Sequence, residues 1–220
     1  MRLLAIDTAL AVCSAAIFDD KDGIIAGESL PMARGHAEAL MPMIARVMAE
    51  AALDYRALDR IAVTVGPGSF TGLRVGVSAA RGLALAANKP AVGVSTLDAI
   101  GMPLMLGEDI PIVVVIDARN EQAYTQAFGE RGYALNTARI APISSAFEGV
   151  PDGPVRVVGS GAAKLAALAL RETIIEDRPN PEILWVATLG ARAPVDVPPK
   201  PLYLHAPHVK PQQTSKLLQQ

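Results

Sequence analysis

The sequence of 220 residues is poor in cysteine, in aromatic residues and in charge, and each shortage excludes a class of protein. Its single cysteine, Cys13, cannot form a disulfide within the chain, so a reducing compartment is expected. Aromatic residues make up only 4% of the sequence, too few for a platform on which nucleic-acid bases stack. The formal net charge is −2, so the chain as a whole carries no basic field that would hold nucleic acid.

Long apolar runs are also missing. No segment has about 18 uninterrupted apolar residues, and Asp7 interrupts the apolar stretch at the N-terminus. The sequence therefore predicts neither a membrane span nor a secretory signal, and we expect a cytoplasmic protein. Hydrophobic residues nevertheless make up 51% of the chain and charged residues only 19%, which indicates that a partner covers part of the surface.

The most specific local pattern is the stretch VTVGPGSFTGLRVGVSAARGLAL, which begins at Val63. It predicts a buried strand, a turn with three glycines, and a helix that Ser69 or Thr71 could cap. A helix N-terminus behind a glycine turn can bind an anion, but the pattern fits neither a Walker loop nor a dinucleotide fingerprint. A plain tight turn is an equally good interpretation. The candidate nucleotide or phosphate contacts are Asp7, Gly66, Gly68 and Ser69.

Two halves of the chain share one order of predicted elements, and placing Asp7 on Asp117 aligns them without gaps. The first half has strands at 2–7, 11–18, 23–30, 61–65 and 91–95, with helices at 36–53 and 73–87. The second half has a helix at 96–106, strands at 112–117, 122–128 and 133–140, and a strand, glycine turn and helix at 155–169. The order predicts an α/β protein of two duplicated β-β-β-α-β-α halves, each a mixed sheet flanked by helices. The expected domains are 1–95 and 96–204, followed by a flexible tail at 205–220.

This layout is similar to that of the actin, hexokinase and Hsp70-like fold (ASKHA, RNase H-like), in which nucleotide binds between the halves. Asp7 and Asp117 could hold a metal there, or each could cap its own hairpin by accepting backbone N–H groups. The first hairpin lacks the glycine and the lysine or serine that would let phosphates approach. The histidines at 205 and 208 lie in a proline-rich tail and do not predict a zinc site.

Five segments together resemble the TsaB family: GHAEALMPMI, GPGSFTGLRVGVSAARGLALA, GVSTLDAI, VVVIDARNEQAY and PLYL. The resemblance extends from Arg2 to about Leu204. It implies a scaffold and activating subunit, not an enzyme by itself, that pairs with the catalytic subunit TsaD. TsaD transfers a threonylcarbamoyl group to N6 of the adenosine 3′ of the anticodon in tRNAs that read ANN codons.

The resemblance also implies which chemistry the chain has lost. TsaD carries a His-x-x-x-His metal motif where this sequence has Thr96 and Ile100, and neither side chain replaces imidazole as a ligand. We therefore expect no catalytic residue, no metal and no required cofactor, with ATP or ADP bound at most at the interface of the complex. One departure is His205, which follows PLYL where the family has arginine.

Two predicted helices carry the expected partner surface. The helix at 36–53 is apolar on more than one face, and Gly72, Gly76 and Ala80 form a small-residue stripe on the second helix. Burial of the stripe inside the chain is the alternative. The resemblance implies contact of both helices with TsaD, a homodimer when TsaD is absent, the ATPase TsaE as a further partner, and tRNA contact only through the complex. The predicted interface residues are His36, Leu40, Met41, Ile44, Met48, Phe70, Thr71, Gly72, Arg74, Val75, Gly76, Ala79 and Ala80.

Two other functions remain open from the sequence. A stand-alone kinase or ATPase of the same fold is the main alternative. A glycoprotease-like peptidase is the third, although no nucleophile with a base, and no set of metal ligands, can be argued from spacing.

Overall fold

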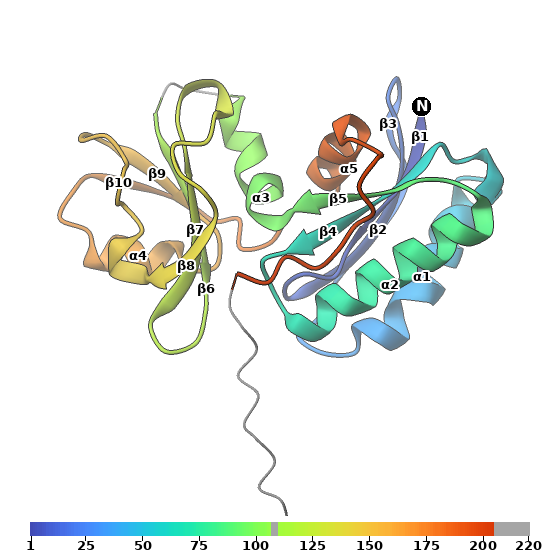
Figure 1. Cartoon of the computed structure of the whole chain (residues 1–220), viewed down its shortest axis with the longest axis horizontal. Helices are drawn as coiled ribbons and strands as arrows, with labels where there is room; N and C mark the ends of the chain where they lie inside the picture. Colours follow the sequence, from blue (N-terminus) through green and yellow to red (C-terminus); the bar gives the residue numbers. More distant parts are fainter. Residues whose placement is uncertain (107–109, 205–220) are drawn as a thin grey trace, which may run out of the picture.

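The computed structural model describes residues 1–106 and 110–204, and it has two lobes, each built on a five-stranded mixed sheet (Figure 1). The first sheet has the strand order β3-β2-β1-β4-β5, and the second has the order β8-β7-β6-β9-β10. Matched in chain order, the two arrangements are the same: two antiparallel pairs on one side of the central strand and two parallel pairs on the other. The predicted duplicated, actin-like α/β fold is confirmed.

The first lobe follows the predicted ranges closely. Its elements are β1 (Arg2–Asp7), β2 (Val12–Asp19), β3 (Gly23–Pro31), α1 (His36–Glu50), η1 (Tyr55–Ala57), β4 (Arg60–Gly66), α2 (Phe70–Ala87) and β5 (Ala91–Ser95). Ser69 is the cap of α2, because its hydroxyl accepts a hydrogen bond of 3.2 Å from the N–H of Gly72. Pro42 lies in the second turn of α1, on its exposed side.

The second half of the chain contains a strand and an α-helix that the sequence did not predict, β10 and α5. Its elements are α3 (Thr96–Met105), β6 (Ile112–Asp117), β7 (Gln122–Phe128), η2 (Glu130–Gly132), β8 (Arg139–Pro142), η3 (Ile143–Ser145), β9 (Val155–Val158), α4 (Ala162–Leu168), β10 (Thr173–Glu176) and α5 (Ile183–Arg192).

The strand predicted at 133–140 is wrong over most of its length. The backbone forms a turn after β7, with a single bridge between Phe128 and Ala134, and β8 starts only at Arg139. The cause is a side chain: Asn136 Oδ1 accepts a hydrogen bond of 2.8 Å from the N–H of Ala127, where a neighbouring strand would offer a carbonyl.

Each sheet is covered in part by the helix that follows the last strand of the other sheet (Figure 1). One face of the first sheet packs against α1 and α2, and the other face packs against α5, with Val186 and Ala187 buried beside Ala62. The helix that follows β5, α3, buries Leu97 and Ile100 against β6 of the second sheet. Residues 1–95 hold the strands of the first sheet and residues 96–204 those of the second, while α5 packs across on the first sheet; residues 205–220 lie outside the described residues.

The C-terminal part of the described chain is bound to the first lobe by polar contacts. The guanidinium of Arg60 donates hydrogen bonds of 3.1, 3.2 and 2.9 Å to the carbonyls of Gly190, Ala191 and Ala193 at the end of α5. Beyond α5, the backbone N–H of Leu202 donates to the carbonyl of Val65 at 2.7 Å. The strap formed by residues 194–204 thus returns across β5 to the space between the lobes (Figure 1).

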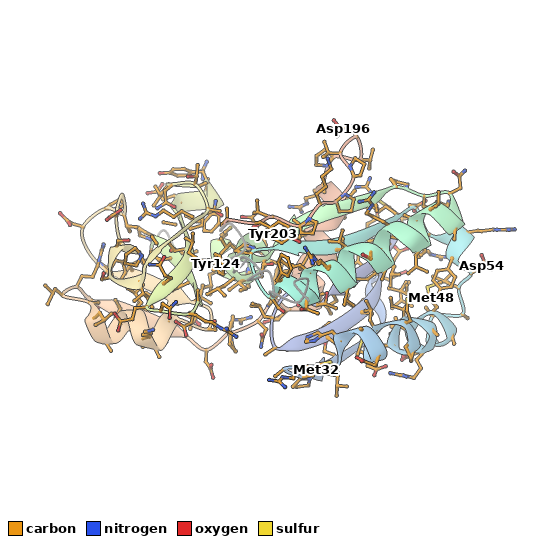
Figure 2. The ribbon with its side chains drawn as sticks, turned by 60° about the horizontal axis from the view of Figure 1, so that its bottom comes forward. Met32, Met48, Asp54, Tyr124, Asp196 and Tyr203 are labelled. Atoms are coloured by element: carbon orange, nitrogen blue, oxygen red, sulfur yellow. The ribbon has the colours of Figure 1, made fainter. Side chains whose placement is uncertain are left out.

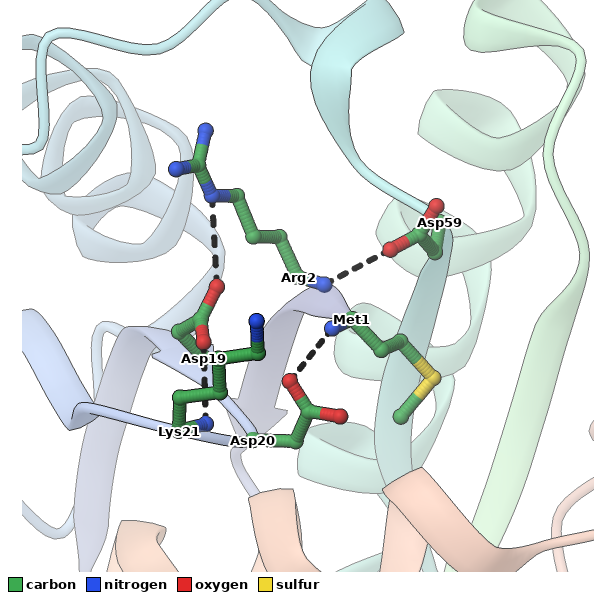
Figure 3. Close-up of polar contacts among 6 residues, drawn as sticks. All are labelled: Met1, Arg2, Asp19, Asp20, Lys21 and Asp59. Atoms are coloured by element: carbon green, nitrogen blue, oxygen red, sulfur yellow. Dashed lines mark hydrogen bonds and ion pairs between the residues drawn. The ribbon is translucent and has the colours of Figure 1, made fainter.

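At the end of the first sheet where β1 starts and β2 ends, the polar groups pair with one another (Figure 3). Arg2 donates its backbone N–H to Asp59 at 2.7 Å and its Nε to Asp19 at 3.3 Å, and the terminal amino group pairs with Asp20. The N–H of Lys21 is the main group that holds the pKa of Asp19 below its ordinary value. These three carboxylates are therefore all paired within the chain.

Among the described residues, no helix is both long enough and apolar enough to cross a membrane.

Candidate functional site

The glycine-rich turn that leads into α2 lies directly on the first hairpin of the same lobe. The backbone N–H of Ser69 donates a hydrogen bond of 2.7 Å to the carbonyl of Ala9. A Cβ atom at Gly68 would lie 2.3 Å from the same carbonyl oxygen. The space that a phosphate would need between turn and hairpin is therefore occupied by Ala9, although Gly68 and Ser69 were predicted as phosphate contacts.

The second lobe repeats this arrangement. The N–H of Gly161 donates to the carbonyl of Val115 at 2.9 Å, and a Cβ atom at Gly159 would lie 2.3 Å from that oxygen. In both lobes, the glycines let the turn approach the central strand or its hairpin closely. The plain structural interpretation of the glycine turns is the one that the geometry supports.

The small-residue stripe on α2 faces the interior of the chain, so its interpretation as a partner surface is wrong. The Thr8 hydroxyl donates a hydrogen bond of 2.8 Å to the carbonyl of Gly72. A Cβ atom would lie 2.0 Å from the Thr8 carbonyl oxygen at Gly72, and 2.4 Å from the Thr8 hydroxyl oxygen at Gly76. Ala80 is fully buried in the core between the sheet and the helices.

The same correction applies to much of α1. His36, Leu40, Ile44 and Met48 were predicted to face a partner, but all four are buried. The last three belong to the core between α1 and the first sheet. The ring of His36 points to the first hairpin, where its Nε2 lies 3.1 Å from the carbonyl oxygen of Leu10. Because a carbonyl oxygen only accepts, this nitrogen carries the proton and donates.

Asp7 is a fully buried acid that caps its own hairpin, which is one of the two roles that the sequence left open. Its Oδ1 accepts hydrogen bonds of 2.6 Å from the Thr64 hydroxyl and 3.0 Å from the N–H of Ala9. Burial raises the pKa of Asp7 to about 6, and these hydrogen bonds offset only part of that rise. Within the described residues, its Oδ2 has no hydrogen-bond partner.

A mainly apolar surface that includes one arginine remains exposed or half-buried on α1 and α2, on the side of the first sheet that these helices cover. Met41, with 45% of its surface exposed, lies on α1. We define the α1–α2 face as the predicted interface residues that the fold leaves exposed or half-buried: Met41, Phe70, Thr71, Arg74, Val75 and Ala79.

Tyr203 lies beside this face and was not among the predicted interface residues. The Arg74 guanidinium lies 3.6 Å from the ring centroid of Phe70, and its Nε donates to the Tyr203 hydroxyl at 3.1 Å. The rings of Phe70 and Tyr203 lie 5.1 Å apart. Tyr203 comes from the strap, so two distant parts of the sequence form one exposed aromatic and cationic cluster. The only sequence signal was the apolar anchor PLYL in a proline-rich segment.

A cleft of about 900 Å³ separates the lobes, next to this cluster. Figure 2 shows Tyr124 and Tyr203 near the junction of the two lobes. The side chain of Asp117 is exposed and lies 3.3 Å from Lys164. The described residues that line the cleft are Leu10, Gly68, Ser69, Phe70, Thr71, Ile116, Asp117, Ala118, Arg119, Asn120, Gln122, Tyr124 and Ile140. The lining includes a single cationic side chain, Arg119, to meet a charged ligand.

The positions compared with a metal motif lie in the core. Thr96 is fully buried at the start of α3, and Ile100 packs in the cluster that includes Val114 and Ile116. Residues 1–106 and 110–204 contain no group of three His, Cys, Asp or Glu side chains placed to hold a metal. His205 and the tail histidine at 208 lie outside the described residues. The expectation that the chain binds no metal stays a prediction.

Comparisons with known proteins give consistent relatives. The family model described as TsaD, tRNA N6-adenosine threonylcarbamoyltransferase, matches residues 23–150. An uncharacterized protein of Mycobacterium tuberculosis is 37% identical over 211 residues, which cover 95% of this chain and 94% of that protein. The tRNA threonylcarbamoyladenosine biosynthesis protein TsaB of Escherichia coli is 35% identical over 125 residues, 56% of this chain and 53% of that protein.

A solved structure matches the whole fold. The structure of YeaZ from Pseudomonas aeruginosa superimposes with a TM-score of 0.80, at 23% sequence identity, over 92% of this chain and 99% of that one. At this sequence identity, the similarity supports the two-lobed fold alone.

Proposed function

Because the chain belongs to the TsaD family of tRNA N6-adenosine threonylcarbamoyltransferases, and within it to the TsaB proteins of tRNA threonylcarbamoyladenosine biosynthesis, we propose that it is the accessory subunit that binds and activates TsaD. In this role, it contributes no reacting group to the transfer of threonylcarbamoyl to N6 of the adenosine. TsaD performs the chemistry, and this chain provides the surface on which TsaD is held.

The observation that carries the proposal is the packing of the first hairpin against the glycine turn. Phosphoryl and acyl transfer need donors aimed at the charge that develops during the reaction. Here the Ser69 N–H is already bonded to Ala9 within the chain. The burial of Thr96 and Ile100, where TsaD has metal ligands, supports the same conclusion.

The α1–α2 face is the proposed contact surface for TsaD. It combines a flexible apolar side chain, Met41, with the Phe70–Arg74–Tyr203 cluster. Aromatic and arginine side chains are the ones that most often dominate the energy of protein interfaces, and methionine adapts to the shape of a partner. In the absence of TsaD, we expect the same face to pair with a second copy of the chain in a symmetric dimer.

The remaining partners follow from this assignment. TsaE, the ATPase of the system, is expected to join the TsaD-bound complex, and tRNA is expected to contact this chain only as part of that complex. ATP or ADP, where bound, would lie at the interface of the complex. All of these steps take place in the cytoplasm under this proposal.

The proposal is tested by reconstitution. The purified chain is mixed with TsaD, TsaE and tRNA from the same organism, and threonylcarbamoyladenosine is measured by mass spectrometry of digested tRNA. We expect modification only when this chain is present, together with co-elution of the chain and TsaD in size-exclusion chromatography. Full modification without this chain would reject the proposal.

A stand-alone ATPase or kinase remains the second candidate, because the cleft between the lobes is large enough for a nucleotide. This function requires steady ATP turnover by the isolated chain, reduced in Asp7→Asn and Asp117→Asn variants. We expect turnover no faster than that of a mock purification.

A further inference from the structure

The short turn between β1 and β2, residues 8–11, hydrogen-bonds to the beginnings of both helices on one side of the first sheet. Its Leu10 carbonyl accepts from the ring of His36, the first residue of α1. Its Ala9 carbonyl accepts from the N–H of Ser69, the cap of α2. Its Thr8 hydroxyl donates to the carbonyl of Gly72 in the first turn of α2.

The turn is itself held firmly in place. Thr8 and Ala9 are completely buried, and the carboxylate of Asp7 accepts the N–H of Ala9 at 3.0 Å. The glycines at 72 and 76 leave no gap above Thr8, because a Cβ atom at either position would overlap it. A side chain with this density of close contacts has one position in the folded chain.

The bond from Thr8 is not needed to satisfy the helix. The carbonyl of Gly72 lies inside α2, where the N–H four residues later is its ordinary partner. The bond from Thr8 is therefore additional, and it joins the helix to a turn of the sheet at a fixed distance. The contact from His36 does the same for α1, which no side-chain cap holds at its N-terminus.

We propose that Thr8 and His36 are positioning residues that set the N-terminal ends of α1 and α2 relative to one another through the turn between β1 and β2. The consequence for TsaD rests on the function proposed above: a partner that contacts both helices meets a preset spacing, so the α1–α2 face is formed before binding. A merely structural role would instead make both residues contribute to stability without changing the spacing of the helices.

The test uses the full chain with spin labels on Glu38→Cys in α1 and Ser78→Cys in α2, both of which are exposed positions. Cys13 is buried and free, so labelling is confined to the two introduced thiols. Pulsed electron paramagnetic resonance gives the distribution of distances between the labels, and affinity for TsaD is measured separately.

Two pairs of variants separate the hydrogen bond from the volume of the side chain. Thr8→Val removes the hydroxyl and keeps the shape, and Thr8→Ser keeps the hydroxyl. His36→Leu removes the donor, and His36→Gln retains one. We expect Thr8→Val and His36→Leu to fold, to broaden or shift the label distances, and to bind TsaD about tenfold more weakly. Thr8→Ser and His36→Gln should restore both measurements.

A distance distribution that is unchanged from the parent protein in folded Thr8→Val and His36→Leu overturns the proposal. Loss of folding in both overturns it too, because the residues would then be required for the fold itself. If the parent protein fails to bind TsaD, the proposed function fails, while the label distances still decide whether the turn positions the helices.

Discussion

Asp7 and Asp117 end equivalent strands of the two lobes, yet Asp7 is fully buried and Asp117 is exposed beside Lys164. Duplication placed both carboxylates at the same point of the fold. The first now holds a hairpin that packs under α2, and the second lies at the edge of the cleft between the lobes. Equivalent positions in the two halves have therefore acquired different physical roles.

The burial of Asp7 predicts a stability that falls as pH rises. Its pKa is raised from 3.8 to about 6, so between these values the folded chain holds a proton that the unfolded chain has lost. Protonated Asp7 therefore adds about 3 kcal/mol to the free energy of unfolding below pH 3.8, and this contribution is fully lost above pH 6. Asp7→Asn should lack it. Urea unfolding of both proteins between pH 4 and pH 7 measures the difference, and parallel stability curves would contradict the prediction.

Gly76→Leu should destabilise the isolated chain. A Cβ atom at this position already lies 2.4 Å from the Thr8 hydroxyl and 3.3 Å from Val63, so a larger side chain must displace the hairpin. We expect a loss of about 1–3 kcal/mol in the free energy of unfolding. The matched control is Gly82→Ala in the same helix, where a Cβ atom meets nothing within 4 Å. That variant should gain up to about 1 kcal/mol. Equal thermal stability of the two variants would show that the stripe is not in the core.

Arg60→Ala should loosen α5 without disturbing α1 or α2. Its guanidinium donates to three carbonyls at the C-terminal end of α5, and this end of a helix favours a cation. We expect a loss of about 1–3 kcal/mol and faster hydrogen exchange confined to α5 and the residues it covers. Arg56→Ala, which changes an exposed arginine of η1, is the control and should leave exchange in α5 unchanged. Faster exchange over the whole first lobe would argue against a local role for Arg60.

Met41→Glu should weaken TsaD binding by about tenfold or more while the thermal stability of the isolated chain stays the same. A carboxylate on the α1–α2 face would lose its water without a partner in the complex. Leu170→Glu makes the same change at a fully exposed leucine in the second lobe, away from that face, and should bind TsaD normally. Calorimetric titration of each variant with TsaD measures the two affinities. Equal affinities would show that Met41 does not contact TsaD.

Most strands and the central glycine turn could be predicted because their signals are local. β-branched runs such as IVVVID, and the repeated Ile-Asp ending, define strands whatever lies around them. The small residues of α2 predicted the close approach of a partner helix, whereas the group that lies there is Thr8 of the same chain. The sequence did not identify the approaching group, because Thr8 lies 64 residues before Gly72 in the chain. A stripe of small residues on a helix has the same pattern whether it faces the core or a partner.

The helix α5 and the burial of His36 were not predicted, because both depend on contacts between distant parts of the sequence. Helix α5 was not predicted, although ILWVATLGAR is an apolar run between Pro181 and Pro194. Its packing against the first sheet is a long-range contact, which no local sequence pattern shows. His36 was predicted to face a partner, but it is buried against the hairpin carbonyl of Leu10, a contact that no local pattern contains.

The packing of α3 and α5, each of which follows the last strand of one sheet and packs against the other sheet, has a consequence for the origin of the chain. The first half, folded alone, would leave much of one apolar face of its sheet bare, since α5 covers that face and α3 contributes only Ala99 to the cluster there. Two separate copies could each cover the other's sheet with the helix that follows the last strand, as in a domain-swapped pair. The present chain has the architecture of such a pair after gene fusion, with two subunits joined into one polypeptide.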